Sequence, residues 1–226
     1  MQYKLSPSSL SLMLECPRCF WIHHNRQKKR PETIFPSLPS GMDSVLKAHF
    51  DKFMEKGKLP PELNKNKDFK DIKLFDNKEL MKVWRTNLKG IRWKDEEGNI
   101  LRGAVDNILV KGKKLIVLDY KTRGFPLKED TAEKYQKQLD IYNFLLRKNG
   151  YETEDYGFLL FYHPSHVLET GEVVFNTDLV KMKINVEDAE KMWKKALKIL
   201  NGPCPKETPA EDECEWCRLI ESEDGE

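Results

Sequence analysis

The sequence lacks a hydrophobic run long enough to cross a membrane or to form the core of a secretory signal. No segment reaches the ~20 consecutive apolar residues that a membrane helix needs. The N-terminal segment carries Glu15 and Arg18 within its most apolar part, unlike a secretory signal. We therefore expect a soluble, cytoplasmic protein with no membrane partner.

A strong excess of charge of one sign is also missing. The 226 residues include 39 Lys and Arg against 37 Asp and Glu, a formal net charge of +2. This balance alone indicates no nucleic-acid partner, so the distribution of charge matters more. Basic residues are concentrated in residues 23–30, HHNRQKKR, just after Phe20 and Trp21, whereas the segment after Cys204 is acidic. The basic segment is either a solvated helix end or a surface that contacts a nucleic-acid strand by phosphate contacts and stacking.

Cysteine is scarce, and its spacing differs from that of a secreted disulfide framework. Four of the five cysteines form two Cys-x-x-Cys pairs, Cys16 with Cys19 and Cys214 with Cys217, and Cys204 is the fifth. The pairs could offer four thiolates to one tetrahedral centre, joining segments at about residues 14–20 and 202–218. Four thiolates suit zinc and a [4Fe–4S] cluster equally well, and buried metal-free cysteines are the alternative.

Hydrophobic periodicity predicts an α+β, or mixed α/β, fold of one domain spanning residues 1–226 around one sheet. The expected helices run from the cap signal at Ser6 or Ser8 toward Cys16, then over residues 42–56, 77–88, 129–148 and 187–201. The expected strands are residues 89–94, 99–110 and 114–121, which form a meander, and residues 156–163 and 171–184.

The strand KLIVLDYK ends in an acid and a base. Side chains alternate along a strand, so Asp119 and Lys121 share a face while Tyr120 points away. A turn centred between Gly112 and Lys113 pairs residues whose numbers sum to 225, which puts Asp106 opposite Asp119. Facing carboxylates repel each other and need a cation. That cation is either Lys121, in a structural ion pair, or Mg²⁺ or Mn²⁺, in a site for phosphodiester hydrolysis.

GAVDNILV followed by LIVLDYKT resembles the motif of the PD-(D/E)XK nucleases, in particular the RecB/AddB-like and CRISPR-adaptation exonucleases. The resemblance implies a restriction-endonuclease-like core, a central mixed sheet flanked by helices. It identifies Asp106 and Asp119 as the acids and Lys121 as the lysine. The Gln-x-x-x-Tyr of those families corresponds to Gln138 and Tyr142, which share one helical face.

The resemblance also implies two metal sites. At the first, Asp106, Asp119 and the carbonyl of Tyr120 would hold Mg²⁺ or Mn²⁺, with His49 as a further ligand on the preceding helix, although Lys47 could equally occupy the position of this histidine. At the second, related nucleases hold an iron–sulfur cluster with one N-terminal and three C-terminal cysteines. This would select Cys16, Cys204, Cys214 and Cys217, whereas the spacing favours Cys16, Cys19, Cys214 and Cys217. The resemblance favours the [4Fe–4S] cluster over zinc.

These observations predict a metal-dependent deoxyribonuclease, an exonuclease on single strands or duplex ends, in DNA repair, recombination or defence. A helicase or another subunit of such a pathway is an expected partner. The alternative is a catalytically silent nucleic-acid-binding or assembly module of the same fold.

Overall fold

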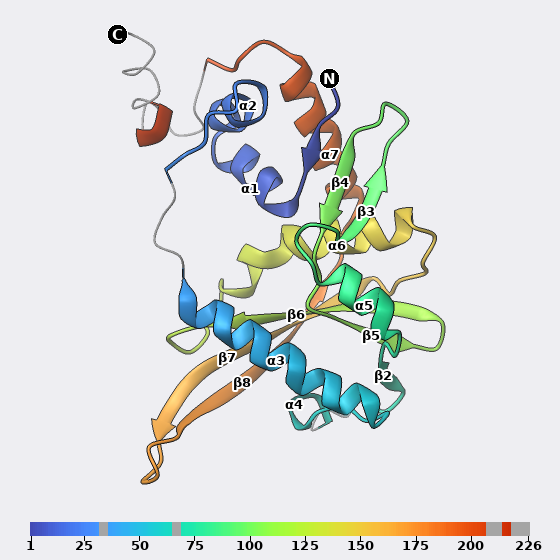
Figure 1. The fold of residues 1–226 in the computed structure, drawn as a ribbon, viewed down its shortest axis with the longest axis vertical. Coiled ribbons are helices and arrows are strands. Elements are labelled where there is room, and N and C mark those ends of the chain that lie inside the picture. Colours follow the sequence, from blue (N-terminus) through green and yellow to red (C-terminus); the bar gives the residue numbers. More distant parts are fainter. Residues whose placement is uncertain (32–35, 65–68, 207–213, 218–226) are drawn as a thin grey trace. The chain divides into compact units, whose positions relative to one another are not determined.

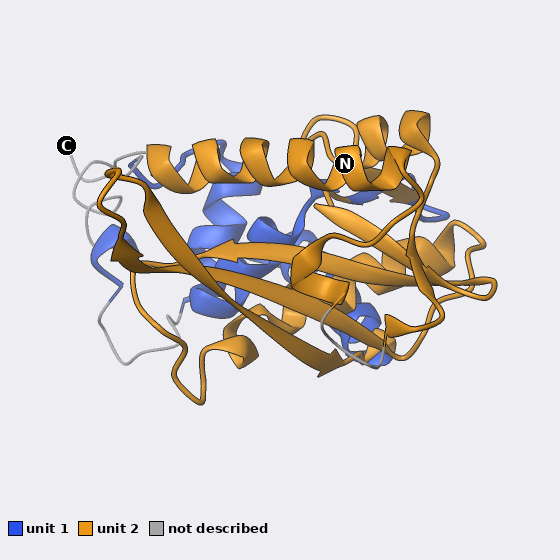
Figure 2. Ribbon diagram, turned by 90° about the horizontal axis from the view of Figure 1, so that it is seen from below, with its two compact units in different colours: residues 1–35, 94–102, 187–226 blue, residues 36–93, 103–186 orange. Residues whose placement is uncertain are grey.

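The computed structural model describes residues 1–31, 36–64, 69–206 and 214–217 (Figure 1). The chain divides into two compact units, shown in different colours in Figure 2. Unit 1 comprises residues 1–35, 94–102 and 187–226, and unit 2 comprises residues 36–93 and 103–186. The single domain expected over residues 1–226 stays a prediction.

Unit 2 contains a five-stranded mixed sheet with the order β2-β5-β6-β7-β8. Its strands are β2 (Ile72–Leu74), β5 (Asn107–Lys111), β6 (Lys114–Thr122), β7 (Tyr156–Val167) and β8 (Val173–Lys183). Only β6 and β7 among these neighbours pair in parallel. A parallel pair needs a crossover connection, and helix α6 (Gln136–Lys148) supplies it. The predicted mixed sheet with flanking helices is confirmed.

The hairpin of β5 and β6 has the predicted register. Asn107 pairs with Leu118 and Lys111 pairs with Lys114, so the numbers of paired residues sum to 225. Gly112, in the two-residue turn, has a φ of 59°, a conformation that glycine adopts at no steric cost. Asp106 is the residue immediately before β5.

The single strand predicted over residues 99–110 is wrong. The structure divides this segment into β4 (Ile100–Gly103) and β5. The Val105 N–H donates to the Trp84 carbonyl at 3.1 Å, so the backbone between the two strands bonds to a helix end instead of to a strand. β4 belongs to a second sheet, of order β1-β4-β3, with β1 at Lys4–Leu5 and β3 at Ile91–Lys94. The predicted three-strand meander is therefore two separate hairpins.

Helix α3 (Ser37–Glu55) packs its apolar side against the sheet of unit 2. Leu46, Phe50 and Met54 are buried in one cluster with Leu118 and Tyr120. Burying each such side chain stabilises the fold by roughly 1.5–3 kcal/mol. This helix was predicted over residues 42–56. In the structure it begins five residues earlier, at Ser37, and ends at Glu55.

The other helices of unit 2 are short. Helix α4 covers Pro61–Asn64, and α5 covers Lys78–Trp84 within the predicted residues 77–88. The helix predicted over residues 129–148 begins only at Gln136, after a 3-10 turn at Ala132–Tyr135.

Unit 1 contains α1 (Pro7–Glu15), α2 (Pro17–Asn25) and α7 (Val186–Asn201). The Ser6 side chain caps α1 by accepting from the Ser9 N–H, as its position at the cap signal predicts. The end of α7 is tied to the N-terminal segment: Trp21 Nε1 donates to the Gly202 carbonyl at 2.9 Å, and the Tyr3 hydroxyl donates to the Leu200 carbonyl at 3.0 Å. Helix α2 had no counterpart in the predicted elements.

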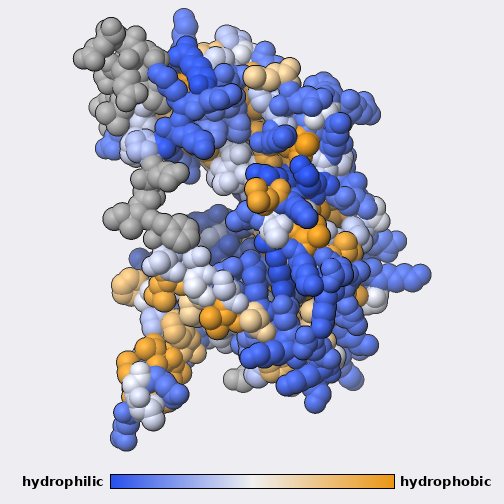
Figure 3. Space-filling view, in the orientation of Figure 1, coloured by the Kyte–Doolittle hydropathy of each residue, from blue (hydrophilic) through white to orange (hydrophobic). Residues whose placement is uncertain are grey.

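Some apolar side chains lie on the surface. Figure 3 shows hydrophobic residues near the loop end of the β7–β8 hairpin, where Val167, Leu168 and Val173 are exposed. Among the described residues, no helix is long and apolar enough to cross a membrane.

Candidate active site and cysteine cluster

Asp119 is a buried acid in the middle of the unit 2 sheet. Its side chain is only 2% exposed and forms an ion pair with Lys121. Burial, followed by the charge of Asp106, raises the pKa of Asp119 to about 7, against the opposing effect of Lys121. Tyr120, between them in sequence, points the other way, with its ring 4.7 Å from that of Phe50. The acid and the base therefore share one face of β6.

Asp106 faces β6 from the start of β5. Its Oδ2 accepts the Tyr120 N–H at 2.8 Å, and its Oδ1 lies 3.1 Å from Lys47 Nζ. Its backbone carbonyl accepts from Arg85 Nε at 2.8 Å. These three contacts fix both the main chain and the carboxylate of Asp106 beside β6, close enough for its charge to affect Asp119.

A chain of hydrogen bonds connects β6 to α6. Lys121 Nζ donates to Gln138 Oε1 at 3.0 Å, and Gln138 Nε2 donates to the Tyr142 hydroxyl at 2.7 Å. The Lys121 ammonium also lies 4.6 Å from the centre of the Tyr135 ring. The structure thus brings Asp106, Asp119, Lys121, Gln138 and Tyr142 into one group.

Tyr142 reaches this group because residue 103 is glycine. A Cβ added at Gly103 would lie 2.7 Å from Tyr142 Cε1, closer than side chains tolerate. The Tyr142 ring is buried, so it has little room to move away.

The structure brings Lys47, not His49, to Asp106. His49 Nε2 lies 3.0 Å from Glu62 Oε1, and its ring contacts those of Phe50 and Phe53. Residues two apart on a helix do not share a face, so α3 can direct only one of Lys47 and His49 toward Asp106. In this arrangement His49 is not part of the group around Asp106 and Asp119.

The sequence interpretation missed three charged residues near Asp106: Arg85, which contacts it directly, and Asp43 and Asp51, which hold its partners. Asp43 Oδ2 lies 2.8 Å from Lys47 Nζ, and both carboxylate oxygens of Asp51 accept from Arg85 Nη1, at 2.8 and 2.9 Å. Positions 43, 47 and 51 are four residues apart and share one face of α3. That spacing of charged residues was visible in the sequence, but the contact with Arg85 was not.

The two carboxylates fit a divalent cation. Asp119 Oδ2 is buried and, apart from its ion pair with Lys121, accepts no aligned hydrogen bond from a described residue. Two neighbouring carboxylates, one of them buried, repel each other, and carboxylate oxygens are the ligands that Mg²⁺ and Mn²⁺ prefer. The chemistry of these donors therefore suits the metal that the sequence motif implies.

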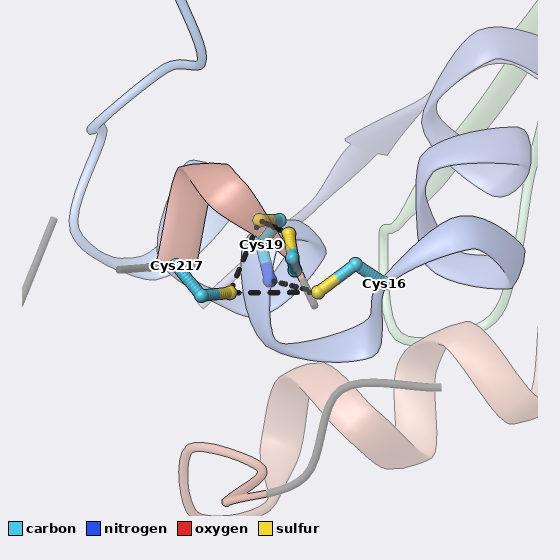
Figure 4. A group of neighbouring side chains, drawn as sticks. Cys16, Cys19 and Cys217 are labelled. Atoms are coloured by element: carbon cyan, nitrogen blue, oxygen red, sulfur yellow. Dashed lines mark hydrogen bonds between the residues drawn. The ribbon is translucent and has the colours of Figure 1, made fainter. Parts of the chain in front are cut away.

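Four cysteines of unit 1 form a compact group. The sulfurs of Cys16, Cys19, Cys214 and Cys217 all lie within 4.8 Å of one another. Figure 4 shows those of Cys16, Cys19 and Cys217 pointing toward one another; Cys217 Sγ is 3.6 Å from Cys16 Sγ and 3.4 Å from Cys19 Sγ. Cys204 is not in this group, which is the set that the pair spacing favours and could hold a metal.

Arg30 lies beside the cysteine cluster. Its Nη2 is 3.8 Å from Cys214 Sγ, and its Nη1 donates to Glu15 at 2.9 Å. Burial raises the pKa of Cys19 to about 11. At Cys214 burial acts in the same direction, but hydrogen bonds from Cys217 and Cys19 outweigh it and lower the pKa to about 7. Cys214 therefore loses its proton more readily than Cys19.

Comparisons with known proteins identify the family of the chain. No curated protein matches the chain. A solved structure titled "Crystal structure of SSO0001" is similar, with a TM-score of 0.47 and 13% identity over 90% of this chain and 79% of that one. The sequence profile of the PD-(D/E)XK nuclease superfamily matches residues 4–222. The chain belongs to the PD-(D/E)XK nuclease superfamily.

Proposed function

We propose that the protein is a divalent-metal-dependent deoxyribonuclease that hydrolyses phosphodiester bonds as an exonuclease. The observation that carries this proposal is the single group formed by two acids, a lysine, a glutamine and a tyrosine, which lie just before β5, on β6 and on α6. Ion pairs account for the two acids, Asp106 with Lys47 and Asp119 with Lys121. Ion pairing alone gives no role to Gln138 and Tyr142, which hold Lys121 in place.

Asp106, Asp119 and the carbonyl of Tyr120 would hold Mg²⁺ or Mn²⁺, which would supply positive charge to the developing phosphorane. Lys121, fixed between Asp119 and Gln138, would orient the attacking water and stabilise the charge on the phosphate. Gln138, itself held by Tyr142, would keep the ammonium directed into the site. Lys47 would add a second positive charge next to Asp106.

The cysteine cluster would join the two ends of the chain around a metal. Three of the six sulfur separations are 3.4–3.6 Å, and all six are within 4.8 Å. The three short ones are close to the edge of about 3.8 Å expected for a tetrahedron with zinc–sulfur bonds of about 2.3 Å. In a [4Fe–4S] cluster each thiolate binds a different iron, so the sulfurs stand further apart. The separations support a single ion such as zinc, whereas the family resemblance favours the cluster.

The test is cleavage of end-labelled single- and double-stranded DNA with Mg²⁺ or Mn²⁺, on protein purified without oxygen. Wild type should cut, and Asp119→Ala and Lys121→Ala should lose at least about 1,000-fold in rate. Lys114→Ala is the matched control, because Lys114 is at the exposed end of the same strand and should cut like wild type. Cleavage by Asp119→Ala at the wild-type rate would contradict the proposal, and the product ladder separates exonuclease from endonuclease action.

One observation favours a catalytically silent binding module instead. Lys47 and Lys121 already pair with Asp106 and Asp119, so the carboxylates are neutralised without a metal. Such a module would bind DNA equally with and without divalent cations and cut neither substrate.

The proposed nuclease would serve DNA repair, recombination or defence, beside a helicase that separates the strands. A binding module would serve the same processes as an assembly part.

A further inference from the structure

A basic pocket in unit 1 has no part in the reaction proposed for unit 2. Its volume is about 470 Å³, within the range of about 300–1,000 Å³ typical of small-ligand sites. Five of its lining residues are cationic: Lys4, Lys28, Lys29, Arg30 and Arg102. No acidic side chain is among the described residues that line it. A cavity walled in this way attracts an anion.

Hydroxyl groups line the same basic pocket at the start of α1. Ser6 Oγ lies 2.8 Å from Ser8 Oγ and 3.1 Å from Ser9 Oγ, and all three serines line the pocket. Hydroxyls supply neutral donors to phosphate oxygens, and the partial positive charge at the N-terminus of α1 acts in the same direction. The wall of the pocket therefore combines cations, which attract an anion over a long range, with hydroxyls, which can donate hydrogen bonds to it.

Two imidazole rings complete the basic pocket. His23 and His24 both line it, with their ring centres 4.7 Å apart. Burial lowers the pKa of His24 to about 4, and burial with the charge of Lys29 lowers that of His23. Both rings are therefore uncharged at neutral pH, and they offer flat aromatic surfaces on which a base can stack.

We propose that the basic pocket binds one nucleotide of a single-stranded nucleic acid, with its phosphate against the lysines and its base against the imidazoles. The pocket is too small to admit a duplex, and the pairing of cations with aromatic rings is the combination that single strands require. That the bound strand is the substrate of the nuclease rests on the proposed function. It gives the basic segment of residues 23–30 a role that the catalytic group does not.

Arg30 connects this binding site to the cysteine cluster. It lines the basic pocket, as does Cys19, and its guanidinium also lies against Cys214. The pocket therefore shares part of its wall with the metal-binding cysteines of the same unit.

The experiment measures binding of a fluorescent ten-nucleotide oligo-dT by anisotropy, on the full chain with Asp119→Asn to prevent cleavage. Lys28→Glu with Lys29→Glu should weaken binding at least 10-fold and lower the slope of log K against log salt by about 0.7, the value for the one phosphate contact that is lost. Lys194→Glu with Lys195→Glu is the matched control, an adjacent exposed pair on α7 outside the pocket with the same change in charge. It should weaken binding less than 3-fold.

Equal effects of the two double variants would overturn the proposal, because only the overall charge would then matter. An equal loss of affinity for a blunt duplex would overturn the single strand as occupant.

Lys29→Gln alone, which changes one charge, should weaken binding about 2- to 3-fold with an unchanged circular dichroism spectrum. An unchanged affinity would count against the pocket. If wild type binds oligo-dT through the pocket and never cuts DNA, the nuclease proposal fails while the pocket stands.

Discussion

The active-site group of unit 2 and the cysteine cluster of unit 1 are assembled in opposite ways. The first takes its side chains from α3, β6, α6 and the residue just before β5, and hydrogen bonds and ion pairs connect them without a metal. The second joins residues 16 and 19 to residues 214 and 217. Among the described residues, sulfur–sulfur contacts join these two segments: Cys217 contacts Cys16 and Cys19, and Cys214 contacts Cys19.

This difference predicts a different dependence on metal. Lysines already oppose the carboxylates of the first site, so its geometry should survive in the apo protein while chemistry stops. The four sulfurs of the second site share the charge of Arg30 and repel one another as thiolates, so this site should need its metal to stay closed. Metal removal should therefore affect catalysis at one site and stability at the other.

The largest effect should come from breaking the cysteine cluster. Cys217→Ser removes a ligand of the described set and should reduce bound metal to below one tenth and destabilise the chain by several kcal/mol. Cys204→Ser is the matched control. It should keep the bound metal and change the free energy of unfolding by no more than about 1 kcal/mol. Metal analysis, absorption near 400 nm for an iron–sulfur cluster and thermal unfolding provide the readouts. If Cys204→Ser loses the metal as well, the one-plus-three cysteine set is correct, because Cys217 belongs to both sets.

The next effect concerns the pH dependence of stability through Asp119. Its pKa is about 7 in the folded chain, raised by burial from 3.8, so the folded state holds the proton more tightly than the unfolded state. Wild type should therefore lose stability relative to Asp119→Asn as pH rises from 5 to 8, by about 2–3 kcal/mol without divalent metal. Urea unfolding of both proteins at the two pH values measures this. A constant difference would show that Asp119 titrates normally.

Lys47 provides a smaller and more selective test. Because it pairs with Asp106, it competes with a divalent cation for that carboxylate. Lys47→Met should raise the affinity for Mn²⁺ about 10-fold, or about 1.4 kcal/mol, in calorimetric titration. Lys52→Met, a change at an exposed position of α3, should leave it unchanged. A weaker Mn²⁺ affinity in Lys47→Met would show that Lys47 organises the site for the metal.

The smallest expected effect is at the end of the hydrogen-bond chain. Tyr142→Phe removes the acceptor of Gln138 Nε2 and should lower the cleavage rate about 5-fold, with little change in Mn²⁺ affinity, since Tyr142 acts through Gln138 and Lys121. Single-turnover cleavage measures the rate. Tyr151→Phe is the control, because the Tyr151 ring contacts that of Trp84, and it should behave as wild type. A 1,000-fold loss in Tyr142→Phe would instead indicate direct contact with the substrate.

Local patterns in the sequence predicted much of the site. The alternation of β6 and the Gly112 turn predicted the register that brings Asp106 to β6, because a two-residue hairpin determines every pair that follows it. The i,i+4 spacing of Gln138 and Tyr142 predicted their shared helix face, and the two Cys-x-x-Cys pairs predicted which sulfurs meet. Each of these relations depends on a few neighbouring residues.

The sequence by itself thus determined the nuclease motif and the mixed sheet, and its spacing favoured the set of four cysteines that the structure brings together. Only the tertiary structure decided that Lys47 and not His49 faces Asp106, that Arg85 and Asp51 support it, and that the chain breaks between β4 and β5. The rotation of α3 about its axis depends on how Leu46 and Phe50 pack into the sheet. Such packing joins residues more than fifty positions apart, and no local pattern encodes it.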